Sequence, residues 1–518
     1  MRGLLTTALA ALGSLSTFVK AESSNSTLEP ITIKGNAFFT GDSRFYIRGV
    51  DYQPGGSSNL TDPLADTDAC KRDIAAFQDL GINTIRVYTV DNSEDHTECM
   101  NMLADAGIYL ILDVNTPDSS ISRFDPRCSY NADYLQNVFA TIDAFADYSN
   151  VLGFFAGNEV VNSVNTTGTA TYVKAVVRDM KKYIKARNYR KIPVGYSAAD
   201  ITSNRQLIAN YLNCGDDEDS RIDMFGINDY SWCGPSSFVV SGYADKMKLY
   251  KGYSVPMFLS EFGCNEVKTS RPFTEIEAIY STQMSSVFSG GLVYEYSQEA
   301  NKYGLVQIND DGTVTKLEDF TNLKNEYKKV SNPQGDGGYS DSNDISTCPD
   351  YQKGTWEANN TLPAMPSAAS AYFSSGAGEP LGTNASTENS CYDDEDDEDD
   401  EDDEDTTSSS SASASSTSSA PSSEASSSSD SASATSSEAS SSTVESSSSE
   451  APTSSTITSE SKSSSMVSST LTTKGKNGKD ASGSAGSSSS SSNSKGAANA
   501  VQVPLVFEMI SYVINMLL

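Results

Sequence analysis

The chain has 518 residues and a formal net charge of −33, which arises from 36 basic and 69 acidic side chains. Thirteen of the acidic side chains form the unbroken run 393–405, which repels itself and is expected to be disordered. No basic stripe is left to neutralise phosphates, so nucleic acid is excluded as a partner class. The single histidine, His96, excludes a zinc site with several histidines, and acid–base chemistry therefore falls to carboxylates.

The N-terminus has the pattern of a secretory signal. Met1 and Arg2 precede the apolar run 4–19, and cleavage is expected after Ala21, which predicts a signal peptide over residues 1–21. Secretion makes disulfides the expected state of the eight cysteines. Five sequons predict N-glycosylation, and they stand at Asn25, Asn59, Asn165, Asn359 and Asn384.

Short apolar runs alternate with amphipathic stretches from residue 22 to residue 335. The apolar runs predict strands at 44–52, 82–90, 108–114, 151–157, 192–197, 222–228, 255–260 and 291–297. Helical patterns lie between them, for example at 69–81, 134–148 and 170–188. Eight strands that alternate with helices predict an α/β fold, the (β/α)8 or TIM barrel. An open doubly wound sheet is the alternative, but no glycine-rich phosphate loop opens the first βα unit.

The composition changes after the predicted barrel. Residues 336–392 are rich in Gly, Ser, Asn and Pro and are expected to form a loosely structured extension. Residues 406–494 are mostly serine, which predicts a disordered, O-glycosylated stalk. Residues 495–518 end in an apolar tail that follows small residues, a pattern typical of a GPI-attachment signal with Asn493 as the attachment point. An ordinary transmembrane helix is the alternative for this tail.

Polar side chains gather where the predicted barrel strands end, which is where barrel enzymes place their catalytic residues. Two of them, Glu159 and Glu261, suit cleavage of a glycosidic bond, in which one acid protonates the leaving oxygen and the other attacks the anomeric carbon. The spacing of Tyr294 and Tyr296 predicts that both lie on one face. Ion pairing or helix capping is the alternative role for the two acids. The full set is Asp51, Tyr52, Gln53, Tyr88, Asp91, Asp113, Asn158, Glu159, Asn228, Asp229, Tyr230, Glu261, Tyr294 and Tyr296.

Several long motifs occur in a family-specific order. They include RGVDYQPGGSS (48–58), FFAGNEV (154–160), DYSWCG (229–234) and SEFGCNE (260–266). With them the chain resembles the fungal β-1,3-glucanosyltransferases of glycoside hydrolase family 72, the Gas, Gel and Phr type, over about residues 28–330. The predicted signal, stalk and anchor also match the layout of that family.

The resemblance implies a retaining enzyme that cleaves β-1,3-glucan and transfers the fragment to another glucan chain, which elongates cell-wall glucan. It implies that Glu159 is the acid/base, that Glu261 is the nucleophile, and that neither a metal nor another cofactor takes part. The sugar contacts that it implies are Gln53, Tyr88, Asp113, Asn158, Tyr230 and Tyr294, with Tyr296 as a further candidate beside Tyr294. The disulfides that it implies are Cys70–Cys99, Cys214–Cys348 and Cys233–Cys264, which leaves Cys128 and Cys391 unassigned.

Two departures from the family pattern keep other functions open. Only Cys348 and Cys391 follow the predicted barrel, so the cysteine-rich carbohydrate-binding module of longer members is absent and the chain resembles the short subfamily. Ser122, in the loop 116–130, stands where the family usually has asparagine. A plain β-1,3-glucan hydrolase and a weakly active or non-catalytic glucan-binding wall protein are therefore the alternatives. The expected state is a monomer, GPI-anchored at the outer face of the plasma membrane or in the cell wall.

Overall fold

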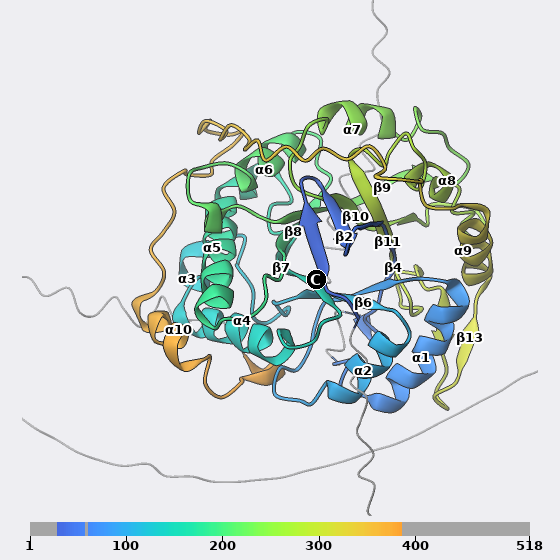
Figure 1. Cartoon of the computed structure of the whole chain (residues 1–518), viewed down its shortest axis with the longest axis horizontal. Helices are drawn as coiled ribbons and strands as arrows, with labels where there is room; N and C mark the ends of the chain where they lie inside the picture. Colours follow the sequence, from blue (N-terminus) through green and yellow to red (C-terminus); the bar gives the residue numbers. More distant parts are fainter. Residues whose placement is uncertain (1–27, 57–60, 386–518) are drawn as a thin grey trace, which may run out of the picture. The chain divides into compact units, whose positions relative to one another are not determined.

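The computed structural model describes residues 28–56 and 61–385. Its centre is a closed barrel of parallel strands in the order β10-β11-β4-β5-β6-β7-β8-β9, with helices around it (Figure 1). Each predicted strand overlaps one barrel strand, which confirms the predicted (β/α)8 barrel. The strands are β4 (Ile47–Asp51), β5 (Thr84–Val87), β6 (Tyr109–Asp113), β7 (Val151–Asn158), β8 (Val194–Ala199), β9 (Met224–Cys233), β10 (Met257–Cys264) and β11 (Phe288–Val293).

The helices follow the strands in alternation. Helix α1 shows how the sequence sets their limits: Asp66 accepts a hydrogen bond from the Ala69 amide (3.0 Å), and Gly81 ends the helix in the left-handed conformation (φ 79°). The α-helices are α1 (Thr67–Leu80), α2 (Thr97–Asp105), α3 (Pro126–Ser129), α4 (Ala132–Phe145), α5 (Ala170–Ala186), α6 (Arg205–Leu212), α7 (Tyr243–Leu249), α8 (Glu275–Ile279) and α9 (Glu318–Lys329). A hairpin of β12 (Val306–Ile308) and β13 (Val314–Lys316) stands between β11 and α9.

An antiparallel sheet of β1 (Ile31–Lys34), β2 (Ala37–Thr40) and β3 (Ser43–Phe45) precedes the barrel. It closes the end where the barrel strands begin, since the Phe38 ring packs 5.8 Å from that of Phe258. The predicted strand 44–52 is therefore two strands. Residues of β3 pair back with β2, whereas β4 pairs with β11.

The chain after α9 packs against the outside of the barrel. Arg178 of α5 donates to the Pro363 carbonyl (2.8 Å), and Trp356 is fully buried beside Tyr211. The short helices η4 (Ser367–Ala371), α10 (Tyr372–Ser375) and η5 (Gly382–Asn384) complete this segment. The predicted loose extension is therefore, up to residue 385, fastened along α4 and α5 (Figure 1).

The structure contains the three disulfides that the resemblance implied, Cys70–Cys99, Cys214–Cys348 and Cys233–Cys264. Cys128 is also disulfide-bonded. Two of the sequon asparagines, Asn165 and Asn359, are exposed. Within the described residues, no helix combines the length and the apolar character that a membrane span requires. The remaining predictions lie outside the described residues: the signal peptide, Asn25, Asn59, Cys391, the acidic run, the stalk, Asn493 and the C-terminal tail.

Candidate active site

The two glutamates stand at the C-terminal end of the barrel, where Glu159 follows β7 and Glu261 lies within β10. Asn228 of β9 contacts both Glu159 and the preceding residue, Asn158. Its side-chain nitrogen Nδ2 donates to Glu159 Oε1 (2.9 Å) and to Asn158 Oδ1 (3.1 Å). The side-chain oxygen Oδ1 of Asn228 accepts from the hydroxyls of Ser197 (3.0 Å) and Ser260 (2.8 Å). Since two hydroxyls hold that oxygen, the amide nitrogen is fixed toward Glu159. The sequence placed Asn228 at the rim but predicted no role for it.

Glu159 has a backbone conformation that few non-glycine residues adopt. Its φ is 48°, a left-handed value that costs about 1–3 kcal/mol for such a residue. Its amide donates to the Ser197 carbonyl (2.8 Å), and its carbonyl accepts from Nε (3.2 Å) and Nη2 (3.1 Å) of Arg123. These bonds hold the strained turn and so fix the direction of the Glu159 side chain.

Glu261 is buried and accepts hydrogen bonds from three donors. Arg86 Nη1 lies 3.2 Å and the Tyr88 hydroxyl 2.9 Å from Oε1, and the Tyr230 hydroxyl lies 2.6 Å from Oε2. Burial raises the pKa of the Tyr88 and Tyr230 hydroxyls well above their ordinary value, so both stay protonated and donate. Donors to both oxygens favour the charged form and fix the plane of the carboxylate.

Arg86 is the one cation that contacts Glu261 among the described residues, and it is fully buried. Asp113 holds it in a fork, with Nε 2.9 Å from Oδ1 and Nη2 2.8 Å from Oδ2. Sequence reasoning missed Arg86, although a charge inside a predicted barrel strand is itself a signal, because a buried charge needs a partner. Asp113 therefore orients Arg86, and its contact with a sugar stays a prediction.

Aromatic side chains stand beside Glu261. The rings of Tyr230, Tyr294 and Tyr303 pack edge to face, with centroids 5.3–6.3 Å apart. Tyr230 and Tyr294 are partly exposed, whereas Tyr303 is buried behind them. Sequence reasoning missed Tyr303, which lies beyond the last predicted strand. The partly exposed rings give the site the kind of surface on which the apolar face of a sugar packs.

The structure contradicts the predicted placement of Tyr296. This side chain is fully buried, and its hydroxyl donates to Asp73 of α1 (2.7 Å), so it does not share a face with Tyr294. The prediction assumed the alternation of a strand, but β11 ends at Val293, and the alternation does not continue past it.

Gln53 lies at the same rim with its amide engaged by the backbone. Its oxygen accepts from the amides of Tyr88 (3.2 Å) and Thr89 (3.0 Å), and its nitrogen donates to the Thr61 carbonyl (2.8 Å). Gln53 thus fixes the backbone that carries Tyr88, and its contact with a sugar stays a prediction.

The two glutamates influence one another electrostatically. Burial raises the pKa of Glu159 and of Glu261, and the charge of Glu159 raises that of Glu261 further. Against this, Arg86 and two tyrosine hydroxyls lower the pKa of Glu261, while Asn228 is the principal group that lowers that of Glu159. The net result is a raised pKa for both acids, to about 7 for Glu261. The three donors around Glu261 and the single amide beside Glu159 are the surroundings expected of a carboxylate and of an acid, respectively. One acid and one carboxylate at one site can carry out glycosidic bond cleavage.

The Cys233–Cys264 disulfide joins the last residues of β9 and β10. Strand β9 carries Asn228, which donates to Glu159, and Tyr230, which donates to Glu261, while Glu261 itself lies on β10. The bridge therefore links the strand that carries these two donors to the strand that carries Glu261.

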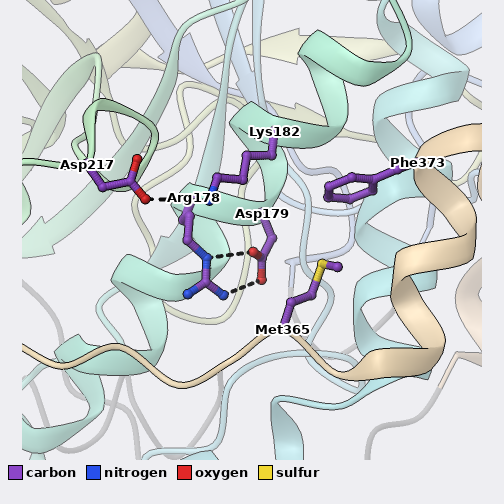
Figure 2. A pocket seen from close by; sticks show the side chains of 6 residues that line it. All are labelled: Arg178, Asp179, Lys182, Asp217, Met365 and Phe373. Carbon is purple, nitrogen blue, oxygen red and sulfur yellow. Dashed lines mark hydrogen bonds and ion pairs between the residues drawn. The ribbon is translucent and has the colours of Figure 1, made fainter.

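A separate cavity of about 340 Å³ lies outside the barrel, between α5 and the segment after α9 (Figure 2). Its charged side chains pair with one another, Arg178 with Asp179 (2.8 Å) and Lys182 with Asp217 (3.5 Å), and Met365 and Phe373 complete the lining. Paired charges on the outer side of α5 belong to the seam that fastens the extension, not to the glutamate site.

The sequence matches the model of a family described as Glucanosyltransferase over residues 20–331. It is 78% identical over 373 residues to the 1,3-beta-glucanosyltransferase GAS5 of Saccharomyces cerevisiae, which covers 72% of this chain and 77% of the relative. It is 57% identical over 382 residues to the 1,3-beta-glucanosyltransferase gel1 of Aspergillus fumigatus, which covers 73% of this chain and 83% of the relative.

A solved structure is similar to this one in both fold and sequence. Gas2p of Saccharomyces cerevisiae, a mutant in complex with laminaritetraose and laminaripentaose, superposes with a TM-score of 0.61 at 43% identity. The match covers 65% of this chain and 75% of the other chain.

Proposed function

This chain belongs to the glucanosyltransferase family and is a β-1,3-glucanosyltransferase, and we propose that its barrel cleaves and transfers glucan by a retaining, two-step mechanism. The observation that carries this proposal is the pair of glutamates in unlike environments, Glu261 with three donors and Glu159 with an amide. The similar Gas2p was solved with laminaritetraose and laminaripentaose, and glucan chains of this kind are the donor and the acceptor here.

In the first step, a carboxylate oxygen of Glu261 attacks the anomeric carbon of the donor glucan. The bond from that carbon to the glycosidic oxygen breaks, and Glu159 gives its proton to the leaving chain. As the ester forms, Glu261 loses its charge, and the Arg86 and tyrosine donors have held the carboxylate in the attacking orientation until that point. The products are a shortened glucan chain and a covalent glycosyl-enzyme.

In the second step, the 3-hydroxyl of another glucan chain attacks the same anomeric carbon. Glu159, now ionised, takes the hydroxyl proton, the ester to Glu261 breaks, and a new β-1,3 bond forms. Water in place of the acceptor would give hydrolysis. Two inversions at one carbon retain the β configuration, and the partly exposed tyrosines Tyr230 and Tyr294 provide stacking surfaces for the sugars.

We infer the site of action from sequence patterns near the two ends of the chain. The pattern over residues 1–21 supports secretion, and the apolar tail over residues 495–518 supports a GPI anchor at the outer face of the plasma membrane. At this location a monomer meets the glucan of the cell wall. Release of the protein from intact cells by a phosphatidylinositol-specific phospholipase tests the anchor, and a protein that stays bound would contradict it.

The mechanism is tested with the full-length protein and one defined β-1,3-gluco-oligosaccharide, with products analysed by mass spectrometry. Wild type is expected to form products both longer and shorter than the substrate. Glu261→Gln cannot form the ester and is expected to abolish both product classes, with a loss of at least about 10³-fold in rate, while oligosaccharide binding by calorimetry persists. Shorter products alone from wild type would make it a hydrolase, and wild-type rates in Glu261→Gln would remove the nucleophile role.

A further inference from the structure

The loop between β6 and α4, residues 114–131 and hereafter the β6–α4 loop, reaches the acid/base side of the site. Its Arg123 guanidinium donates to the Glu159 carbonyl from Nε (3.2 Å) and Nη2 (3.1 Å). In a retaining glycosyl transfer, the acid/base faces the sugar that leaves and then the sugar that arrives. The β6–α4 loop therefore lies beside the residue that takes the proton of the acceptor hydroxyl.

Phe124, the residue next to Arg123, projects into solvent from this loop. It is 95% exposed, the largest exposed fraction among the exposed large hydrophobic side chains in the described part of the chain. Contact with a partner that covers this ring would remove apolar surface from water, which is favourable.

The exposure of Phe124 is not a consequence of a loose loop. Ser122 Oγ accepts from the amides of Phe124 (3.3 Å) and Asp125 (3.2 Å), and the Ser122 amide donates to Ser129 Oγ (2.9 Å). Together with the Arg123 bonds to Glu159, these contacts fix the backbone on both sides of Phe124. The backbone therefore presents Phe124 to solvent directly beside the residue that contacts Glu159.

We propose that Phe124 is an acceptor-binding residue, whose ring stacks on a glucose unit of the incoming β-1,3-glucan chain. This inference rests on the proposed function and deepens it. The C–H faces of a pyranose are apolar, and an aromatic face offers them both apolar surface and a partial negative charge. The acceptor is the occupant because the loop that carries Phe124 is tied to the acid/base and not to the nucleophile.

This stacking determines what fraction of the covalent intermediate reacts with an acceptor glucan (transfer) and what fraction reacts with water (hydrolysis). In the second step the ester to Glu261 breaks, a bond forms from the anomeric carbon to the acceptor O3, and the hydroxyl proton passes to Glu159. Water attacks by the same route but gains nothing from an aromatic ring. A ring that holds the acceptor raises its effective concentration near the ester, so the loss of Phe124 moves the partition toward hydrolysis.

The test compares full-length wild type with Phe124→Ala, Phe124→Trp and Tyr351→Ala. Tyr351 is a matched control, since it is an aromatic side chain 59% exposed in the extension and not in the site. A fixed donor oligosaccharide is combined with increasing amounts of an isotopically labelled β-1,3-gluco-oligosaccharide acceptor, and labelled transfer products and hydrolysis products are counted by mass spectrometry. Thermal unfolding is measured for each variant.

Phe124→Ala is expected to raise the acceptor KM roughly tenfold and to lower the ratio of transfer to hydrolysis at limiting acceptor. Saturating acceptor should recover the transfer rate, Phe124→Trp should bind acceptor as well as wild type, and Tyr351→Ala should behave as wild type. An unchanged acceptor KM in Phe124→Ala would overturn this inference but not the proposed function. A loss of transfer rate that saturating acceptor does not restore would do the same. A wild type that forms no longer products overturns the proposed function and the inference together.

Discussion

At the scale of single residues, the carboxylate of Glu261 depends on donors from two places, Arg86 and Tyr88 at the end of β5 and Tyr230 on β9. The shortest of these hydrogen bonds joins the Tyr230 hydroxyl to Oε2 at 2.6 Å, and it lowers the pKa of Glu261 against the effect of burial. A hydrogen bond to a charged group contributes about 1.5–3 kcal/mol. The nucleophile is active only when ionised, so the donors widen the acidic range in which the enzyme works.

Tyr230→Phe removes that donor and is expected to raise the pKa of Glu261. The acidic limb of the kcat/KM profile should then move to higher pH, by roughly one pH unit if about 1.4 kcal/mol is lost. Measuring kcat/KM through the acidic range with one oligosaccharide checks this shift. Tyr294→Phe is the matched control, since the Tyr294 hydroxyl accepts from Asn301 (3.3 Å) and, within the described residues, makes no hydrogen bond to Glu261, so its variant should keep the wild-type limb. An unmoved limb in Tyr230→Phe would show that the hydroxyl does not stabilise the charged nucleophile.

Asp51, at the end of β4, is a buried carboxyl that the proposed mechanism does not use. It is fully buried, and neither oxygen has a hydrogen-bond partner within the described residues. Burial raises its pKa well above the ordinary value, Arg86 opposes the rise, and the charge of Glu261 adds to it. Because the folded pKa exceeds the unfolded one, the folded state keeps a proton that the unfolded state releases. Stability contributed by this group is therefore lost as the pH rises from about 3.9, the unfolded pKa.

Asp51→Asn abolishes this titration while keeping the shape of the side chain. Its melting temperature is expected to exceed that of wild type near neutral pH, and the difference should vanish below about pH 3.9, where Asp51 is protonated in both states. Thermal unfolding at a series of pH values measures it. Asp73→Asn is the contrasting variant, because Asp73 accepts from Arg72, Tyr52 and Tyr296, and its replacement should destabilise. A lower melting temperature for Asp51→Asn at neutral pH would show that Asp51 is charged and paired when folded.

At the scale of elements, the sequence predicted best where a strong periodicity coincided with burial. The strand over 108–114 became β6, and the helix over 170–188 became α5, which has a continuous buried face. The short helices α7 and α8 have too few residues to show a helical period. The sheet of β1 to β3 was missed apart from its last residues, because its strands are short and only β2 is mostly buried.

The candidate site was predictable where residues stand at strand ends and unpredictable where contacts join different strands. Glu159 and Glu261 follow directly from the barrel rule. The contact of Arg86 with Asp113 and Glu261 depends on the order β10-β11-β4-β5-β6 around the barrel and on side-chain direction, which no single stretch of sequence shows. The predicted position of the Tyr296 side chain was wrong for a related reason, since its hydrogen-bond partner Asp73 lies on α1 and not on a neighbouring strand.

At the scale of the whole described part of the chain, the extension after α9 is bound to the barrel at points far apart in the sequence. Cys348 is bonded to Cys214, and the amide of Glu357 donates to Thr167 Oγ1 (3.0 Å). Between these points lies Trp356, which is fully buried with its ring centroid 5.5 Å from that of Tyr211 on α6. The segment that its composition predicted to be loose therefore contains one large buried side chain, Trp356, which packs against the outside of the barrel.

Trp356→Ala is expected to destabilise the barrel by about 3–5 kcal/mol, because it removes a large buried ring and leaves a cavity beside α6. The transfer chemistry should persist below the melting temperature, since the cavity lies outside the barrel and the glutamates keep their donors. Denaturant unfolding gives the free energy, and product analysis gives the activity. Trp356→Phe separates packing from hydrogen bonding: Trp356 Nε1 has no partner within the described residues, so an aromatic replacement should recover most of the loss. An unchanged unfolding free energy in Trp356→Ala would mean that the extension and the barrel unfold independently, and the barrel would then be stable without its outer segment.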